Sequence, residues 1–509
     1  MLFNSIEFLL FFLPVTLFVY LRIQDARIAL LWISLASLFF YGYWNPIYLL
    51  LILASIFVNL SLGKRIVKVE GSNKYYLTAA GVTFNLALLG YFKYANFFVE
   101  NVGELIGTEW TIDQIVLPLA ISFFTFQQIA YLVDSSRGKV VEHGIIEYVA
   151  FVTFFPQLIA GPIVHQKDML PQFRKIFALK NVPGNLALGF TIFSIGLFKK
   201  VGIADELALY ANPVFDFALG DGQLSFSEAW GGALAYTFQL YFDFSGYSDM
   251  AIGLGQMFGI TLPVNFASPY KSRSIIEFWR TWHISLSNFL RDYLYITLGG
   301  NRFGELMRYR NLYLTMLLGG FWHGAGWNFL MWGALHGFYL TLNHLWRSLP
   351  FHESLADSRT YGYLSWALTF LCVVIGWVFF RAESVDAAFS VLASMFALNG
   401  AHLPSAVIEV LPGFLSDKFQ VGAFFPNLRL DWGVAVLILV PAALIAFIAP
   451  NVFEMFAGRL DGDINAKVSR RDTRITWQPS IVWALVASLF ITYSLLSLSE
   501  PSEFLYFQF

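Results

Sequence analysis

The chain has 509 residues, of which 57% are hydrophobic, 18% aromatic and only 13% charged, and its mean hydropathy is +0.61. This balance excludes an ordinary soluble domain and indicates a protein that is embedded in a lipid bilayer. The 32 basic and 34 acidic residues nearly cancel, which excludes a nucleic-acid-binding surface.

Long, continuous apolar runs predict an all-α polytopic membrane protein and argue against a β-barrel, whose strands would alternate over about ten residues. We expect one integral membrane domain over residues 1–509, with about 11 transmembrane helices. The first 20 residues lack a basic segment and a cleavage site, so they are interpreted as a retained span. The runs cover residues 1–20, 28–44, 47–63, 76–92, 114–133, 146–164, 186–204, 228–244, 311–345, 361–380, 432–450 and 479–497.

The run at 146–164 does not fit a simple crossing. Basic loops orient the predicted bundle with its N-terminus outward and with 381–430 as a periplasmic loop. A full crossing at 146–164 would then place the basic residues of 167–180 on the wrong face. Pro156, Gly161 and Pro162 break a helix, so a re-entrant turn is predicted, with a kinked ordinary span as the alternative.

The segment Ile275–Thr297 has the pattern of one amphipathic helix that lies in the membrane interface. Together with its flanks, 265–310, it predicts a basic cytoplasmic region that either anchors to anionic lipid or meets an anionic acyl donor. The expected apolar face comprises Ile276, Trp279, Trp282, Leu286, Phe289 and Tyr293, and the polar face Glu277, Arg280, Ser287 and Arg291.

Two histidines, His323 and His336, lie in a stretch that is hydrophobic enough for membrane depth, where a titratable side chain indicates a functional site. Small residues, Gly324 and Gly326, follow His323 and leave room for a substrate. On one unbroken helix the two rings would point apart. Either these glycines break the helix and let the rings converge, or one histidine is structural; we assign the chemistry to His323 as general base and a supporting role to His336.

Polar residues elsewhere in the apolar runs are further candidates. Residues 243–249, Asp-Phe-Ser-Gly-Tyr-Ser-Asp, predict a broken helix whose Asp243, Ser245 and Asp249 line a substrate site or cap the restarting helix, without a metal-ligand pattern. Snorkelling accounts for the paired lysines 199 and 200, and a polar tunnel would account for these lysines and for the glutamines at 127 and 128 together. The single Cys372 excludes a cysteine metal cluster and is interpreted as a small core residue.

Taken together and in this order, several motifs resemble the membrane-bound O-acyltransferases, and within that family the bacterial proteins of alginate O-acetylation. The motifs are Phe155-Pro-Gln-Leu-Ile-Ala-Gly-Pro162, the 243–249 stretch, Glu277-Phe-Trp-Arg-Thr-Trp-His283, Trp322-His323-Gly324, His336 and Gly376-Trp-Val-Phe-Phe-Arg-Ala382. The resemblance implies a helical bundle around a central funnel, with His323 at the position of the family's invariant histidine and His336 at that of a second histidine.

The resemblance also implies the reaction. An acetyl group would be taken from a cytoplasmic thioester, acetyl-CoA or an acylated carrier protein, and passed across the bacterial inner membrane for O-acetylation of an exopolysaccharide such as alginate. No resident cofactor is expected, and the expected partner is a periplasmic or membrane-anchored acetyltransferase. Substrate contacts are expected from Asp243, Ser245, Asp249, Arg280, His283, Trp322, Gly324, Gly326, Trp327 and Asn328.

The residues leave other functions open. D-alanyl export uses a related bundle, and the aromatic tail 500–509, which ends Phe504-Leu-Tyr-Phe-Gln-Phe509, resembles the ending of acyl-exporting relatives or else anchors in the interface. From another class, a transporter would also have broken helices and buried polar groups, although no internal repeat is visible. A scaffold of a polysaccharide-export complex is the third reading.

Overall fold

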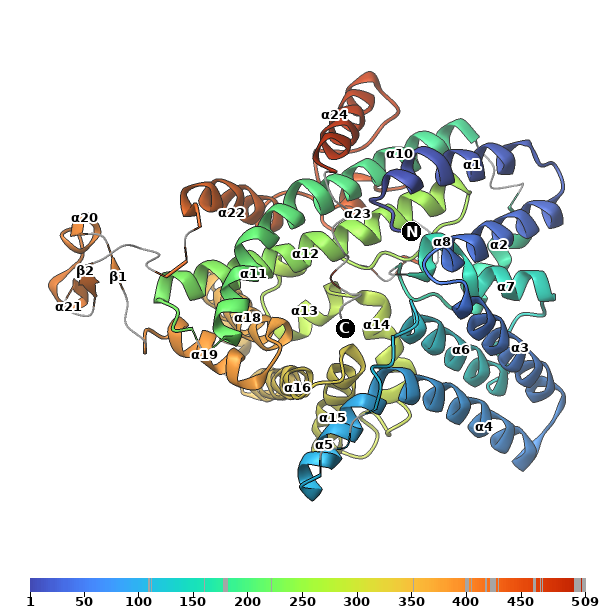
Figure 1. The fold of residues 1–509 in the computed structure, drawn as a ribbon, viewed down its shortest axis with the longest axis horizontal. Helices are drawn as coiled ribbons and strands as arrows, with labels where there is room; N and C mark the ends of the chain where they lie inside the picture. Colours follow the sequence, from blue (N-terminus) through green and yellow to red (C-terminus); the bar gives the residue numbers. More distant parts are fainter. Residues whose placement is uncertain are drawn as a thin grey trace. The chain divides into compact units, whose positions relative to one another are not determined.

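The computed structural model describes residues 1–509 apart from 109, 111, 160, 177–181, 221, 351, 399–401, 404, 417–418, 422–426, 429, 461–463, 467, 469, 499–504 and 506–509. The aromatic tail predicted at 500–509 therefore lies outside the described residues, except for Leu505. Helices form nearly all of the regular structure, as predicted (Figure 1). The chain divides into two compact units, one from Met1–Phe198, Phe244–Asn265 and Val452–Gln508, the other chiefly from Lys199–Asp243 and Phe266–Asn451.

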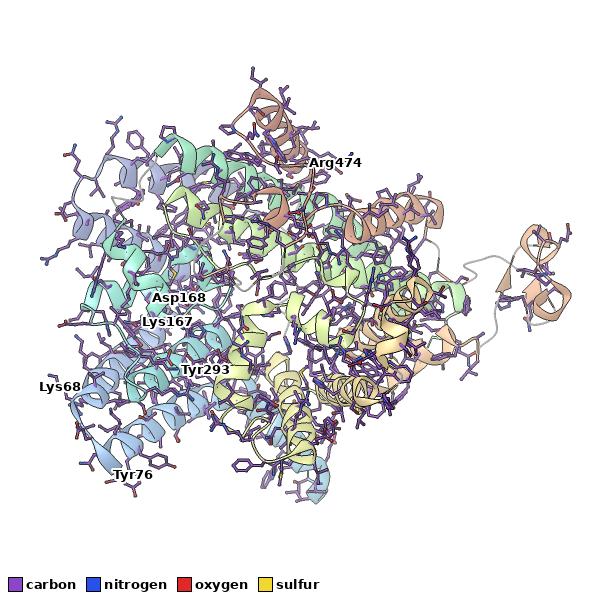
Figure 2. All side chains as sticks on the ribbon, turned by 180° about the vertical axis from the view of Figure 1, so that it is seen from behind. Lys68, Tyr76, Lys167, Asp168, Tyr293 and Arg474 are labelled. Carbon is purple, nitrogen blue, oxygen red and sulfur yellow. The ribbon has the colours of Figure 1, made fainter. Side chains whose placement is uncertain are left out.

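The first unit contains the N-terminal helices. Its elements are η1 (Phe8–Phe12), α1 (Leu13–Arg22), α2 (Ala26–Gly42), α3 (Ile47–Lys68), α4 (Gly71–Leu89), η2 (Gly90–Tyr94), α5 (Ala95–Ile106), α6 (Ile121–Ser136), α7 (Ile145–Thr153), α8 (Phe155–Leu158), α9 (Gln166–Arg174), α10 (Val182–Phe198), the last part of α12 (Phe226–Met257), α23 (Val452–Met455) and α24 (Ile481–Ser497). Lys68 and Tyr76, on either side of the α3–α4 turn, point outward (Figure 2).

The second unit contains both histidines of interest. Its elements are η3 (Lys199–Ala204), α11 (Asp205–Leu219), the first part of α12, η4 (Pro269–Lys271), α13 (Ile275–Thr281), α14 (Ile284–Phe289), η5 (Leu290–Tyr295), α15 (Glu305–His323), α16 (Trp327–Ser348), α17 (His352–Ala356), α18 (Arg359–Arg381), α19 (Val385–Met395), β1 (His402–Leu403), α20 (Ser405–Ile408), α21 (Gly413–Ser416), β2 (Gln420–Val421) and α22 (Trp432–Phe447). β1 and β2 pair in parallel, with His402 opposite Gln420.

Helices suited to a membrane occur in both units. Among the described residues, Ile47–Lys68, Pro183–Leu219 and Arg359–Arg381 are long and apolar enough to cross a bilayer, and five shorter apolar helices accompany them. The predicted number of spans, their orientation and the domain boundaries remain predictions. The break predicted within 146–164 is confirmed, because α7 ends at Thr153 and only the short α8 follows. A helix of nine residues is about 14 Å long, less than half of the hydrocarbon thickness.

The predicted break at 243–249 is wrong, since α12 runs without interruption over 32 residues. Its small residues serve helix packing instead of a helix break. A Cβ atom on Gly196 of α10 would lie 2.6 Å from the carbonyl oxygen of Gly246, and one on Gly253 would lie 2.6 Å from that of Gly189. Movement of a side chain cannot relieve either clash, because the added Cβ would meet a backbone carbonyl oxygen. The glycines therefore let α10 and the last part of α12 approach closely within the first unit.

The segment Ile275–Thr297 was predicted as a single helix, and this prediction is also wrong. Trp282 is extended and His283 has a positive φ of 43°, so α13 ends and α14 begins there. The predicted amphipathic division holds in part. The predicted apolar face is buried except for Tyr293, which is half-buried. On the predicted polar face Arg280 and Arg291 are exposed, whereas Glu277 and Ser287 are half-buried. Whether this segment lies at a membrane interface remains a prediction.

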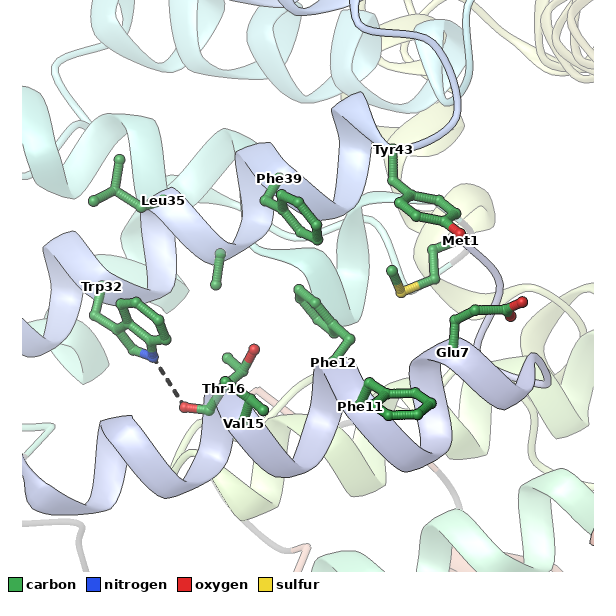
Figure 3. Close-up of a pocket in the computed structure, with 11 residues that line it drawn as sticks. Met1, Glu7, Phe11, Phe12, Val15, Thr16, Trp32, Leu35, Phe39 and Tyr43 are labelled. Carbon is green, nitrogen blue, oxygen red and sulfur yellow. Dashed lines mark hydrogen bonds between the residues drawn. The ribbon is translucent and has the colours of Figure 1, made fainter.

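The first unit has a groove of about 570 Å³ between α1 and α2 (Figure 3). Its lining is almost entirely apolar, with Phe12 and Phe39 facing each other across it and Glu7 near one end. The indole of Trp32 donates a hydrogen bond of 2.9 Å to the carbonyl oxygen of Thr16 at the other end. None of the residues predicted for a functional site lines this groove.

Candidate functional site: two imidazoles on a helical hairpin

The two candidate histidines lie on a tight hairpin of α15 and α16. Gly324 and Gly326 are both extended, with φ of −158° and −161°, so α15 ends at His323 and α16 begins at Trp327. The helix break predicted from these glycines is confirmed. A Cβ atom on Gly320 would lie 2.4 Å from the carbonyl oxygen of Phe329, and one on Gly333 would lie 2.5 Å from that of Met316. The two helices therefore pack backbone against backbone along the segment that carries the imidazoles.

The imidazoles of His323 and His336 pack on the same indole, that of Trp332. The ring centroid of His323 lies 5.0 Å from that of Trp332, and the ring centroid of His336 lies 4.9 Å from it. Phe380 on α18 contacts His323 at 5.2 Å and Trp332 at 5.3 Å. His323 is 5% exposed and His336 is fully buried, so neither ring faces lipid. The hairpin thus brings the two rings to one aromatic cluster.

His336 is held from three further directions. The indole nitrogen of Trp279 on α13 donates a hydrogen bond of 3.3 Å to Nδ1 of His336. The ring of Phe278 lies nearly parallel to the imidazole, at 6.2 Å and 14°. On the remaining edge, Nε2 faces Gly376 of α18, where a Cβ atom would lie 2.8 Å from this nitrogen. α13, α16 and α18 together therefore fix the orientation of the ring.

The residues around the hairpin loop have different surroundings. Trp322 is 4% exposed, whereas Trp327 is 59% exposed, so these two predicted contact residues do not share one environment. The Asn328 amide donates a hydrogen bond of 2.7 Å to the carbonyl oxygen of Ala382 and ties the hairpin to the end of α18. A Cβ atom on Gly324 would lie 2.1 Å from the Phe329 ring, and one on Gly326 would lie 2.3 Å from Oδ1 of Asn328. A side chain at either position would therefore displace Phe329 or Asn328.

Arg280 and His283, the two predicted substrate contacts before the hairpin, differ in burial. Arg280 is exposed on α13. His283 is fully buried in the left-handed turn between α13 and α14, and this burial lowers its pKa to about 3. His283 is therefore neutral at physiological pH. Arg280, in contrast, remains accessible to solvent.

Asp243 takes part in a buried ion cluster. Nζ of Lys200 lies 2.6 Å from Oδ1 of Asp243 and 2.8 Å from Oδ1 of Asp205. The side chains of Lys200 and Asp243 are 2% and 1% exposed. Snorkelling of Lys200 to the membrane surface is therefore wrong, because the lysine is neutralised by carboxylates in place of water. In the first unit, Ser245 and Asp249 of α12 are also buried.

Three basic side chains act on His344 near the end of α16. Nη2 of Arg308 lies 2.7 Å from Nδ1 of His344. Arg347 and Arg280 also interact electrostatically with this imidazole. Arg347 in turn donates a hydrogen bond of 2.9 Å to Oγ of Ser274, before α13. The basic side chains predicted in 265–310 are thus joined by Arg347, which the sequence analysis did not include.

Trp279, Trp332 and Gly376 were not singled out as site residues from the sequence. Trp279 was placed on the apolar face of the interfacial segment, and Gly376 appeared only as the start of a motif. The sequence feature that could have indicated them is a tryptophan, Trp279, on that apolar face together with a glycine, Gly376, in an otherwise bulky apolar helix. It could not reveal that both meet His336, because 57 and 40 residues separate them from it.

Comparisons with known proteins bear directly on this arrangement. The sequence profile of the MBOAT, membrane-bound O-acyltransferase, family matches residues 72–384, which include both histidines, Trp279 and Gly376. The chain belongs to the membrane-bound O-acyltransferase family. It is therefore a membrane-embedded acyltransferase, and the all-α fold and the resemblance inferred from its motifs are confirmed.

Several characterised or named proteins are similar to the chain. A probable alginate O-acetylase AlgI of Pseudomonas aeruginosa is 41% identical over the full length of both chains. A peptidoglycan O-acetyltransferase of Helicobacter pylori is 45% identical over 79% of this chain and 81% of its own. A teichoic acid D-alanyltransferase of Streptococcus thermophilus is 30% identical over 45% of this chain and 57% of its own. Acyltransferase chemistry is common to all three names, and their acceptors differ.

Proposed function

We propose that this protein takes an acetyl group from a cytoplasmic thioester and passes it across the bacterial inner membrane for O-acetylation of an exopolysaccharide such as alginate. The observation that carries the proposal is the location of His323, buried in an aromatic cluster at the turn of a glycine-dependent hairpin. Full-length similarity to a probable alginate O-acetylase supports acetyl as the transferred group.

In the proposed reaction, His323 acts as the general base. Its neutral imidazole removes the proton of the acceptor hydroxyl as the hydroxyl oxygen attacks the acyl carbonyl carbon. The tetrahedral intermediate then collapses with cleavage of the carbon–sulfur bond, and the imidazolium returns the proton to the departing thiolate. No redox partner or resident cofactor is required. The extended backbone at Gly324 and Gly326 is the proposed position for amides that stabilise the intermediate.

The donor is proposed to be acetyl-CoA or an acylated carrier protein, which carries phosphate groups and so cannot cross hydrocarbon. The basic side chains near His344 support a docking place for such a donor, because Arg308 contacts this imidazole and the charges of Arg347 and Arg280 act on it. Only the small acyl group would then move through the protein. A periplasmic or membrane-anchored acetyltransferase is the proposed partner that completes transfer to the polymer.

The decisive experiment replaces His323 by Ala in cells that make the acetylated polymer. We expect acetyl ester on the polymer, measured by mass spectrometry, to be lost while the protein remains in the membrane at its normal amount. His352→Ala, on the separate helix α17, is the matched control and should keep normal ester content. Normal acetylation by His323→Ala would contradict the proposed base, and esterified D-alanine in place of acetate would favour an aminoacyl exporter, as the similarity to a D-alanyltransferase allows.

A further inference from the structure

His336 carries a hydrogen-bond donor that none of the described groups uses. Because the Trp279 N–H donates to Nδ1, that nitrogen must present its lone pair, and the proton of the neutral ring is on Nε2. Among the described residues, no atom accepts a hydrogen bond from Nε2, although the side chain is fully buried. A buried donor without an acceptor costs about 1–3 kcal/mol, so such a group in a functional site calls for an acceptor on a ligand.

Gly376 of α18 faces this donor without a side chain. A Cβ atom there would lie 2.8 Å from Nε2 and 3.6 Å from Cδ1 of Trp332. The ring cannot turn away from this glycine without losing the Trp279 hydrogen bond and its packing on Trp332 and Phe278. The donor is therefore fixed in direction before any ligand arrives, which is what stabilisation of a developing charge requires.

We propose that Nε2–H of His336 binds the carbonyl oxygen of the acyl group and stabilises the oxyanion that forms there, with Trp279 and Gly376 as positioning residues. This inference rests on the proposed acetyl transfer and assigns His336 a role distinct from that of the base. The centroids of the two imidazoles can be separated by no more than the sum of their 5.0 Å and 4.9 Å distances to Trp332. A hydroxyl about 3 Å from the base and a carbonyl oxygen about 3 Å from the donor fit such a separation.

The test uses the full-length protein in membranes from polymer-producing cells, with acetyl-CoA as the donor and release of its free thiol as the readout. His336→Ala should lower kcat about 100-fold with little change in KM for acetyl-CoA, as for loss of one oxyanion donor. His336→Gln, whose amide offers an N–H, should recover at least about tenfold of that loss. Trp279→Phe should lower kcat about fivefold, the equivalent of one hydrogen bond of about 1 kcal/mol.

A control separates this role from packing. Trp366→Phe removes an indole hydrogen bond of 2.9 Å to the carbonyl oxygen of Tyr270, away from both histidines, and should leave kcat unchanged. If His336→Ala lowers only the melting temperature and the amount of folded protein, while kcat per folded molecule stays within threefold of wild type, the inference is overturned. A Gln variant no better than the Ala variant also overturns it. Failure of the proposed function is distinguishable, because His323→Ala would then retain thiol release.

Discussion

The backbone contact between α15 and α16 makes a strong prediction for Gly320→Ala. The added Cβ would lie 2.4 Å from the carbonyl oxygen of Phe329, whereas a carbon and a carbonyl oxygen require about 3.3 Å. The helices must therefore separate by about 1 Å at this point. Overpacking of this kind costs about 1–3 kcal/mol, which exceeds the gain of up to about 1 kcal/mol from replacing glycine within a helix.

Activity should fall further than stability in this variant. Gly320 precedes His323 by less than one helical turn, and Phe329 precedes Trp332 by the same number of residues, so the separation occurs where the imidazole meets the indole. A misplacement of about 1 Å costs about 100-fold in rate when a reacting geometry is held. The assay is thiol release from acetyl-CoA, normalised to folded protein from fluorescence-detected size exclusion.

Gly319→Ala is the matched control on the neighbouring residue. Its Cβ would meet only Cδ1 of Leu290, at 3.1 Å, and a leucine methyl group can move aside. We expect this variant to keep its activity and to have a melting temperature equal to or above that of wild type. Equal activity and stability in the two alanine variants would refute the claim that close backbone packing of the hairpin positions His323.

Three further predictions follow from buried or clustered charges. Burial lowers the pKa of His283 to about 3, so its neutral form contributes stability that is complete above about pH 6.5 and is lost as the pH falls. Between about pH 7.5 and 5.5 the free energy of unfolding should fall by about 1.4 kcal/mol. Equilibrium unfolding in mixed micelles should show that His283→Asn makes the free energy of unfolding less dependent on pH. Lys200→Met should lower the free energy of unfolding by about 3–5 kcal/mol, because the buried carboxylate of Asp243 loses its ammonium partner. Asp243→Asn in the same chain should restore most of this loss, and a double variant as unstable as the single one would contradict the pairing. The double variant Arg308→Ala and Arg347→Ala should raise KM for acetyl-CoA about tenfold and make this KM less dependent on salt, while kcat is retained. An unchanged KM would exclude these basic side chains from donor docking.

The sequence predicted the helical class, the main apolar segments and the hairpin break, because each depends on local composition. Gly324 and Gly326 lie beside each other in the chain, and extended glycines end a helix wherever they occur. The unbroken α12 was missed for a local reason as well. Ser and Asp near Gly246 have the composition of a cap, and the close packing of α10 on this part of the continuous α12 could not be derived from that composition.

The candidate site could be predicted only in part. His323 and His336 were recognised from their apolar surroundings, and the reversal of the chain between them followed from the glycines. The partners of His336 could not be derived, since Trp279 and Gly376 come from distant helices and have ordinary roles in the local pattern. Likewise, the pattern that favoured snorkelling for Lys200 is identical to the pattern of a buried lysine; the carboxylate of Asp243 decides between them.

Aromatic side chains pack around both imidazoles in the second unit. The rings that contact His323 and His336 are those of Trp279, Trp322, Trp332, Phe278, Tyr339, Trp377 and Phe380. Aromatic surroundings exclude water, which would otherwise compete with the acceptor hydroxyl for the thioester. They also strengthen the hydrogen bond from a fixed donor to a developing oxyanion, because charges attract more strongly in surroundings of low dielectric constant. An acyltransferase that handles a charged donor therefore gains by holding the donor's phosphates at a basic surface and its carbonyl group among neutral rings.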